Sequence, residues 1–343
     1  MNNKNIKELF EIFTPKVEEK DKMFYEILKK NKDENVEARG FKLIKRFKPA
    51  MITAVLIMLL TTTAFAAKHF GLDKMFIGFL NPSSNEQVEY LSNGAYVIDK
   101  QVSNRNGTLD IKQVIGDDNL TYILMDFIAR EGTVLAKDRY RFEDLSLTMG
   151  PDFYSADFIL LSDQNSKDNI ISIVARIMTK NSIAGKNIKL EFSNLQGSDS
   201  FPGEFQTVIP GTWKSSLELN FKEYSTIYQL DKKISMFDYD GILKSVSVSP
   251  ISISLKVESS SLEDIDKAAG GLKEVGLNEY LDNYPITINY KDGATETSTI
   301  FNGMYLSEYG LNEAIIIKTF ENVINDKEIE SIVFFDTIIP IYN

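Results

Sequence analysis

The chain has 343 residues, a net charge of −11 at pH 7, one histidine and no cysteine. Without cysteine it has no disulfides, no cysteine-ligated zinc or iron–sulfur cluster and no lipoprotein anchor. Residues 1–48 carry 13 Lys and Arg against 9 Asp and Glu, whereas the rest carries 25 against 40. The acidic part repels nucleic acid, so we expect no nucleic-acid partner, and it attracts cations or basic peptides.

One uncharged segment, residues 49–67, separates these two parts. As a helix it spans roughly 28 Å, close to the hydrocarbon core of a bilayer at about 30 Å. A soluble core helix would show a polar stripe, whereas the polar side chains here are threonines that can bond to their own helix. Ala64-Phe65-Ala66 has the form of a signal-peptide cleavage site, but 48 residues precede the segment. We therefore expect an uncleaved transmembrane helix rather than a cleaved signal.

The flanks of the segment predict its orientation. Five basic residues precede it with no acid after Glu37, and the other flank is nearly neutral. Because positive flanks stay in the cytoplasm, we expect a single-pass protein of the cell membrane with its N-terminus inside and its C-terminus outside. The topology-determining residues are Arg39, Lys42, Lys45, Arg46 and Lys48.

Residues 1–48 are typical of a cytoplasmic tail of two short helices. Apolar residues recur at helical spacing on both sides of Thr14-Pro15, an N-cap followed by a first-turn proline. So short a tail cannot build a core alone, so its apolar stripe needs another copy, a second protein or the membrane surface. The opposite face is mixed in charge, which argues against the membrane surface. The stripe consists of Ile6, Leu9, Phe10, Phe13, Phe24, Ile27 and Leu28.

After the span, residues 68–94 form a connector with a short helix near 72–76, and the hydrophobic period then changes to two. Strands with polar turns predict a first antiparallel β-sandwich over residues 95–200. A stretch rich in Gly, Ser and Pro follows as a domain boundary.

Strands resume over residues 204–343, with a short helix within 261–276, and predict a second β-sandwich-like domain. The predicted fold class is therefore a mainly β ectodomain of two sandwiches, a short α-helical cytoplasmic tail and one transmembrane helix.

Catalytic and metal-binding motifs are missing from the sequence. The single histidine, His69, flanks the span, so a Ser-His-Asp triad or a His-rich metal site would depend on it. Residues 163–174 resemble a calcium loop in part, but Asp168 replaces its glycine and Val174 its bidentate glutamate. No phosphate-binding loop is present. We expect no enzyme, with no catalytic, cofactor-binding or metal-ligating residue.

The order of parts resembles a family of bacterial single-pass membrane proteins whose ectodomain is a domain of unknown function, numbered four-one-seven-nine. The resemblance rests on AAKHFGLDKMF at residues 66–76 and GTLDIKQVIGDDNLTYILMDFIAREGTVL at 107–135. It covers roughly residues 49–145, and the part after Gly203 resembles a β-sandwich often appended to that family. Family members resemble negative effectors of extracytoplasmic-function sigma factors. The resemblance implies an anti-sigma factor whose tail binds a sigma factor and whose ectodomain responds to an extracellular ligand or a protease.

The tail departs from one known type of anti-sigma domain. Zinc-type domains hold a His-x-x-x-Cys-x-x-Cys site, and this chain has neither cysteine nor a histidine before the span. A sigma-binding tail here would be of the zinc-free helical kind that orders on its partner. Two alternatives stay open. One is a surface-exposed structural, adhesive or ligand-binding membrane protein without a transcriptional role, and the other is a cell-wall enzyme that uses a carboxylate pair.

Overall fold

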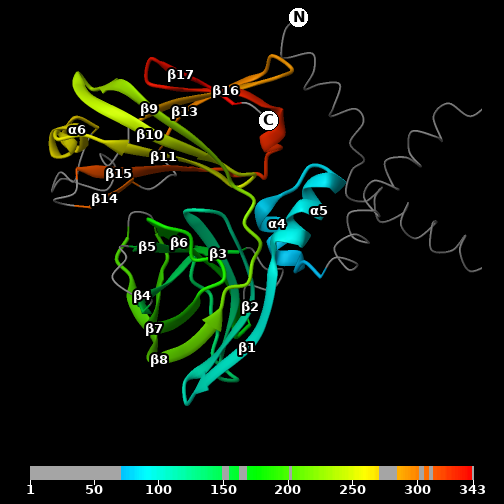
Figure 1. Cartoon of the computed structure of the whole chain (residues 1–343). Helices are drawn as coiled ribbons and strands as arrows, with labels where there is room; N and C mark the ends of the chain where they lie inside the picture. The colour runs from blue at the N-terminus through cyan, green and yellow to red at the C-terminus, as the bar shows by residue number, and fades with distance from the viewer. Residues whose placement is uncertain are drawn as a thin grey trace, which may run out of the picture. The chain divides into compact units, whose positions relative to one another are not determined.

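The computed structural model describes seven segments, which belong to one compact unit, Leu56–Asn343 (Figure 1). Within them the chain is mainly β, with four antiparallel sheets and three α-helices, as predicted for the part after the span. No helix in these segments is long and apolar enough to cross a membrane. The predicted tail and span, residues 1–67, lie outside them. The described segments are 71–148, 154–161, 168–200, 203–269, 284–300, 305–308 and 312–341.

Two sheets that face each other form what we call the first module. One sheet has the strand order β1-β2-β3-β6-β5 and the other β4-β7-β8. Their inward side chains share one hydrophobic core, because residues alternate between faces along each strand. The strands are β1 (Tyr96–Asn104), β2 (Gly107–Gly116), β3 (Leu120–Ala129), β4 (Arg139–Thr148), β5 (Tyr154–Leu160), β6 (Ile170–Thr179), β7 (Asn187–Ser198) and β8 (Gln206–Glu218).

Aromatic side chains fill the centre of this core. Trp213 is fully buried and its indole N–H donates a 3.0 Å hydrogen bond to the carbonyl of Gly107, on the opposite sheet. The ring of Phe127 meets that of Trp213 edge-on at 5.0 Å. A buried tryptophan with its polar atom satisfied ties β8 to β2 across the core.

The second module is built in the same way from two further sheets. Their strand orders are β14-β15-β11-β10-β9 and β13-β12-β16-β17, and they also share one core. Its helix α6 (Leu262–Ala269) falls within the helix predicted at 261–276. The strands are β9 (Thr226–Met236), β10 (Tyr239–Val248), β11 (Ser252–Glu258), β12 (Pro285–Tyr290), β13 (Thr295–Thr299), β14 (Tyr305–Glu308), β15 (Glu313–Thr319), β16 (Ile329–Phe334) and β17 (Thr337–Pro340), with a 3₁₀ turn at Asp326–Glu328.

The chain passes between the modules later than residues 200–204, where the sequence predicted it. Strand β8 pairs with β7 in the first module, and Phe221 still belongs to the first core. The stretch rich in Gly, Ser and Pro therefore does not separate the modules, because the strands on either side of it, β7 and β8, pair in one sheet. The crossing itself occurs just before β9 begins at Thr226.

The connector contains two helices rather than one. Helix α4 (Lys74–Leu80) begins at Asp73, whose side chain accepts a hydrogen bond from the N–H of Met75. Helix α5 (Asn85–Gly94) begins at Ser84, whose hydroxyl accepts a bond from the N–H of Gln87. Both are N-caps of the residue types that the first turn of a helix favours.

Candidate functional site

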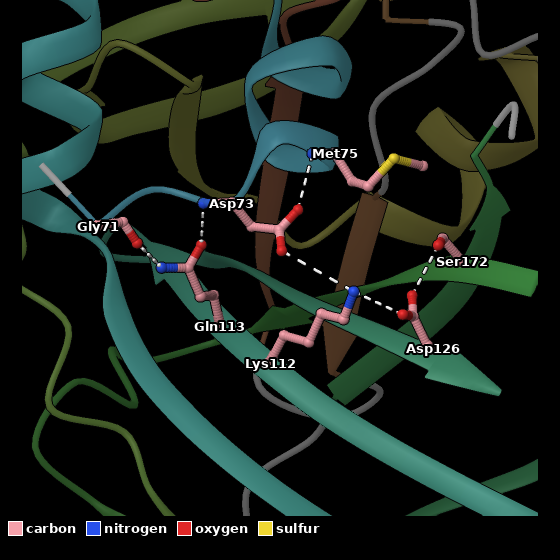
Figure 2. A network of polar contacts seen from close by, with 7 residues as sticks. All are labelled: Gly71, Asp73, Met75, Lys112, Gln113, Asp126 and Ser172. Carbon is pink, nitrogen blue, oxygen red and sulfur yellow. Dashed lines mark hydrogen bonds and ion pairs between the residues drawn. The ribbon is translucent and has the colours of Figure 1, made fainter. Parts of the chain in front are cut away.

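Gln113 on β2 holds the chain where α4 begins, and we call this contact the Gln113 clamp. Its Oε1 accepts a 2.6 Å hydrogen bond from the N–H of Asp73, and its Nε2 donates a 2.6 Å bond to the carbonyl of Gly71 (Figure 2). Only 4% of Gln113 is exposed, so removing its amide would leave two partly buried backbone groups unpaired. Gly71 lies four residues after Ala67, the last residue of the predicted span.

Lys112 extends this contact into an ion-pair network (Figure 2). Its Nζ lies 2.5 Å from Oδ2 of Asp126 on β3 and 3.8 Å from Oδ2 of Asp73. Ser172 on β6 donates a 2.6 Å bond to Oδ1 of Asp126. Burial lowers the pKa of Lys112, but the hydrogen bond and charge of Asp126 outweigh it, and the pKa lies above its ordinary value. Lys112 thus stays charged and links the N-cap of α4 to β3.

Helices α4 and α5 also contact the second module. The N–H of Val323 donates a 2.9 Å bond to the carbonyl of Leu80, and Gln87 Nε2 donates a 3.0 Å bond to the carbonyl of Val323. A third hydrophobic cluster joins the two helices to both modules. It includes Leu72, Phe76, Leu80 and Leu91 from the helical segment, Leu120, Tyr122, Val174 and Met178 from the first module, and Ile251, Ile317 and Val323 from the second.

The modules contact each other directly through Asp117, at the turn between β2 and β3. Its Oδ1 accepts bonds from the N–H groups of Asn119 and Leu120, at 3.0 and 2.8 Å. Its Oδ2 accepts bonds from the hydroxyls of Ser249, in the turn between β10 and β11, and of Ser252, the first residue of β11, at 2.6 and 2.5 Å. Burial raises the pKa of Asp117, and these four hydrogen bonds oppose the rise. A buried carboxylate of the first module therefore organises a turn of the second.

Asn119 adds a second polar connection beside it. Its Nδ2 donates 3.0 Å bonds to the carbonyls of Thr179 and Lys180, at the end of β6. Its Oδ1 accepts a 2.7 Å bond from the hydroxyl of Ser254 on β11. The Asn119 side chain therefore has hydrogen-bond partners in both modules, which favours one position of β11 relative to β6.

Asp118 lies between these two residues and is only half-buried. Burial raises its pKa from 3.8 to about 6, helped by the negative charges of Glu223 and Asp117 and opposed by Lys256. Its own N–H donates a 3.0 Å bond to the hydroxyl of Ser225. Proton uptake at mildly acid pH is thus expected at the module boundary.

Several cavities open on the described part of the chain. One of about 630 Å³ lies between β4 and β5, with Phe142, Phe158 and Phe205 among its lining residues. One of about 410 Å³ adjoins α5, and one of about 280 Å³ lies at the module boundary beside Asp118. No group of three or more His, Asp or Glu side chains in the described segments could hold a metal ion.

The predicted sigma-binding and topology-determining residues, Ile6 to Lys48, lie outside the described residues. His69 lies outside them too. The contacts at Gln113 and at Asp117 were not foreseen. The sequence of Asp117-Asp118-Asn119 is typical of a turn, which gives no indication of the distant serine partners of Asp117.

Comparisons with known proteins leave the identity of the chain open. No family model and no curated protein matches it. Among solved structures, it is similar to the crystal structure of a conserved domain protein from Bacillus anthracis, at 13% sequence identity and a TM-score of 0.46. The match covers 69% of this chain and 75% of that chain. A similarity at this level supports no statement about function.

Proposed function

We propose that the chain is a membrane-anchored anti-sigma factor. Its tail, residues 1–48, would hold an extracytoplasmic-function sigma factor through the apolar stripe, and its β ectodomain would sense an envelope signal. The five basic residues that flank residues 49–67 would keep the tail in the cytoplasm and the ectodomain outside. The proposal needs no catalytic step, cofactor or nucleic-acid contact.

The observation that supports this proposal is the double attachment of residues 71–94. The Gln113 clamp holds the start of this segment to the first module. The bonds of Leu80 and Gln87 to Val323 hold its middle to the second module. A change in how the modules meet at Asp117 would therefore alter the forces on the chain where it leaves the predicted span. A signal that crosses a membrane requires this kind of coupling, in which a change in the contact between the modules also changes the chain at the span.

A surface-exposed structural, adhesive or ligand-binding protein is the alternative function. Such a protein also needs a firm attachment to its anchor, but it needs no partner for the tail. The two functions therefore differ in the tail rather than in the ectodomain.

Topology is the first test. Alkaline phosphatase is active only outside the cytoplasm, so a fusion after Gly203 should be active and a fusion after Asn31 inactive. Activity at Asn31, or a mature protein that begins at Ala67, would contradict the proposed anchor.

Partner capture is the second test. The full chain, purified from membranes of its native host, should bring a sigma factor with it, identified by mass spectrometry. A variant without residues 1–30 should reach the membrane and bring none. Recovery of the intact chain without a sigma factor would favour the surface-protein alternative.

A further inference from the structure

The cavity of about 410 Å³ beside α5 brings together four separate segments. Its lining comes from α5, from the crossing between the modules at Tyr224, and from two loops of the second module around Pro250 and Asp326. The volume is within the usual range of pockets for small ligands and single side chains. Any occupant would contact the helical segment and the second module at once.

Two tyrosines form an aromatic wall of this cavity. The ring centroids of Tyr90 on α5 and Tyr224 lie 4.5 Å apart, with the rings tilted by 54°. The ammonium group of Lys222 already rests over the ring of Tyr224, 4.5 Å from its centroid. Tyr224 is therefore a ring that already holds a cation of the chain itself, and an occupant of the cavity would meet the remaining surface of the pair.

The charges around the aromatic pair are mostly negative. Glu86 and Glu89 lie on α5 and Asp326 on the facing loop, while Lys327 is a base in the same lining. Burial raises the pKa of Tyr90, and the negative charges of Asp117 and Asp326 add to the rise. A negative potential at an aromatic wall favours a cation with an apolar stem, as in lysine and arginine side chains.

We propose that this cavity binds a basic side chain of an extracytoplasmic peptide. The apolar stem would pack on Tyr90 and Tyr224, and the charged end would lie among the carboxylates of Glu86, Glu89 and Asp326. Binding would tie α5 to the loop at Asp326, next to the existing bond between Gln87 and Val323. The binding site for a basic side chain stands on its own, while the extracytoplasmic location of the peptide and its use as a signal for the tail rest on the proposed function.

Calorimetry of the full chain in nanodiscs of zwitterionic lipid tests the site. The probe is the peptide acetyl-Ala-Lys-Leu-Arg-Ala-amide, compared with the same peptide carrying glutamine at both basic positions. The basic peptide should bind and the neutral peptide should not. Equal binding of both peptides, or equally tight binding of ethylammonium alone, would overturn the basic peptide as occupant.

Matched variants distinguish binding of the peptide in this cavity from a general attraction of a basic peptide to an acidic protein. Glu86→Gln with Glu89→Gln should weaken binding of the basic peptide at least fivefold. Glu131→Gln with Glu204→Gln makes the same change in net charge at exposed positions away from the cavity, and should change it less than twofold. Both pairs lie on the surface, so folding is preserved and checked by the melting temperature. An equal loss in the two double variants would overturn the site.

Transcription in cells tests separately whether peptide binding regulates the sigma factor. Addition of the basic peptide to cells should change transcription by the bound sigma factor, and Glu86→Gln with Glu89→Gln should reduce that response. Binding without any transcriptional response would overturn the regulatory role and leave the site intact. Failure of the proposed function would show separately, as a tail that captures no sigma factor.

Discussion

The hydroxyl of Ser252 donates a 2.5 Å hydrogen bond to Oδ2 of Asp117, although the two residues lie 135 positions apart in the sequence. Ser249 donates to the same oxygen at 2.6 Å. Ser249 lies in the turn between β10 and β11 and Ser252 is the first residue of β11, so one buried carboxylate of the first module is the acceptor for two hydroxyls of the second.

Replacement of Asp117 by alanine should destabilise the protein strongly. It would leave two hydroxyls and two backbone N–H groups without their acceptor, and each buried unpaired group costs about 1–3 kcal/mol. Because hydroxyls can rotate to other partners, we expect a total loss of roughly 2–5 kcal/mol in the free energy of unfolding. Urea unfolding of the full chain, followed by the fluorescence of its single tryptophan, Trp213, measures it. The exposed control Glu131→Ala should stay within about 0.5 kcal/mol of the wild type, and an equal effect of both variants would contradict the role of Asp117.

Asp118 should make stability depend on pH. Its pKa in the folded protein is about 6, above the ordinary value of 3.8, so the folded state holds this proton more tightly than the unfolded state. Protonated Asp118 therefore contributes to the free energy of unfolding below about pH 4, and this contribution is lost as the pH rises through about 6. The variant Asp118→Asn should therefore be more stable than the wild type at pH 7, and the difference should shrink at about pH 4. Urea midpoints at both pH values test this, and a difference that grows on acidification would contradict it.

The Gln113 clamp should protect the start of α4 from exchange with solvent. Gln113→Leu keeps a side chain of similar size but removes both hydrogen bonds, so the N–H of Asp73 should exchange faster with deuterated solvent. Hydrogen exchange over residues 71–80, measured by mass spectrometry on the full chain, gives the readout. The control Gln101→Leu changes an exposed glutamine on β1 and should leave this segment unchanged. Unaltered exchange in Gln113→Leu would mean that the clamp does not hold the segment.

Two glycines should respond to alanine in opposite directions. A Cβ at Gly116 would lie 2.8 Å from the carbonyl oxygen of Leu120 and 2.8 Å from the ring of Phe221, whereas a Cβ at Gly78 in α4 would meet nothing within 4 Å. Gly116→Ala should therefore cost about 1–3 kcal/mol. Gly78→Ala should stabilise by up to about 1 kcal/mol, because alanine favours helix. Equal shifts in the urea midpoint would contradict the packing around Gly116.

Local patterns in the sequence predicted the strands well. The alternation over residues 95–200 indicated strands joined by polar turns, and the structure pairs Asn104 with Gly107 at such a turn between β1 and β2. The β7–β8 hairpin was not recognised because its loop has the composition of a linker. Helix α5 was also missed, since its mean hydropathy is low and its cap, Ser84, resembles an ordinary loop serine.

Local patterns in the sequence do not predict the contacts of the candidate site. The pairing register shifts between Ile111 and Gln113, where a bulge breaks the alternation of faces, so burial of Gln113 does not follow from the period of the strand. For Asp117, turn chemistry indicates its local bonds to Asn119 and Leu120 but carries no information about a serine 135 positions away. Long-range polar contacts of this kind depend on how the modules meet, which no local pattern encodes.

In the tail, Phe10 and Phe24 lie on the predicted apolar stripe. Loss of a buried aromatic side chain at the centre of an interface costs about 2–4 kcal/mol, or tens- to several-hundred-fold in affinity. The double variant Phe10→Ala with Phe24→Ala should therefore release the sigma factor, whereas Glu19→Ala should have little effect because an exposed charge contributes little.

The decisive measurement is transcription from a promoter of the captured sigma factor, in cells where each variant is present in the membrane at the wild-type level and in the same orientation. Phe10→Ala with Phe24→Ala should raise this transcription, and Glu19→Ala should leave it at the wild-type level. Unchanged transcription in the double variant would contradict the anti-sigma function and favour a surface protein.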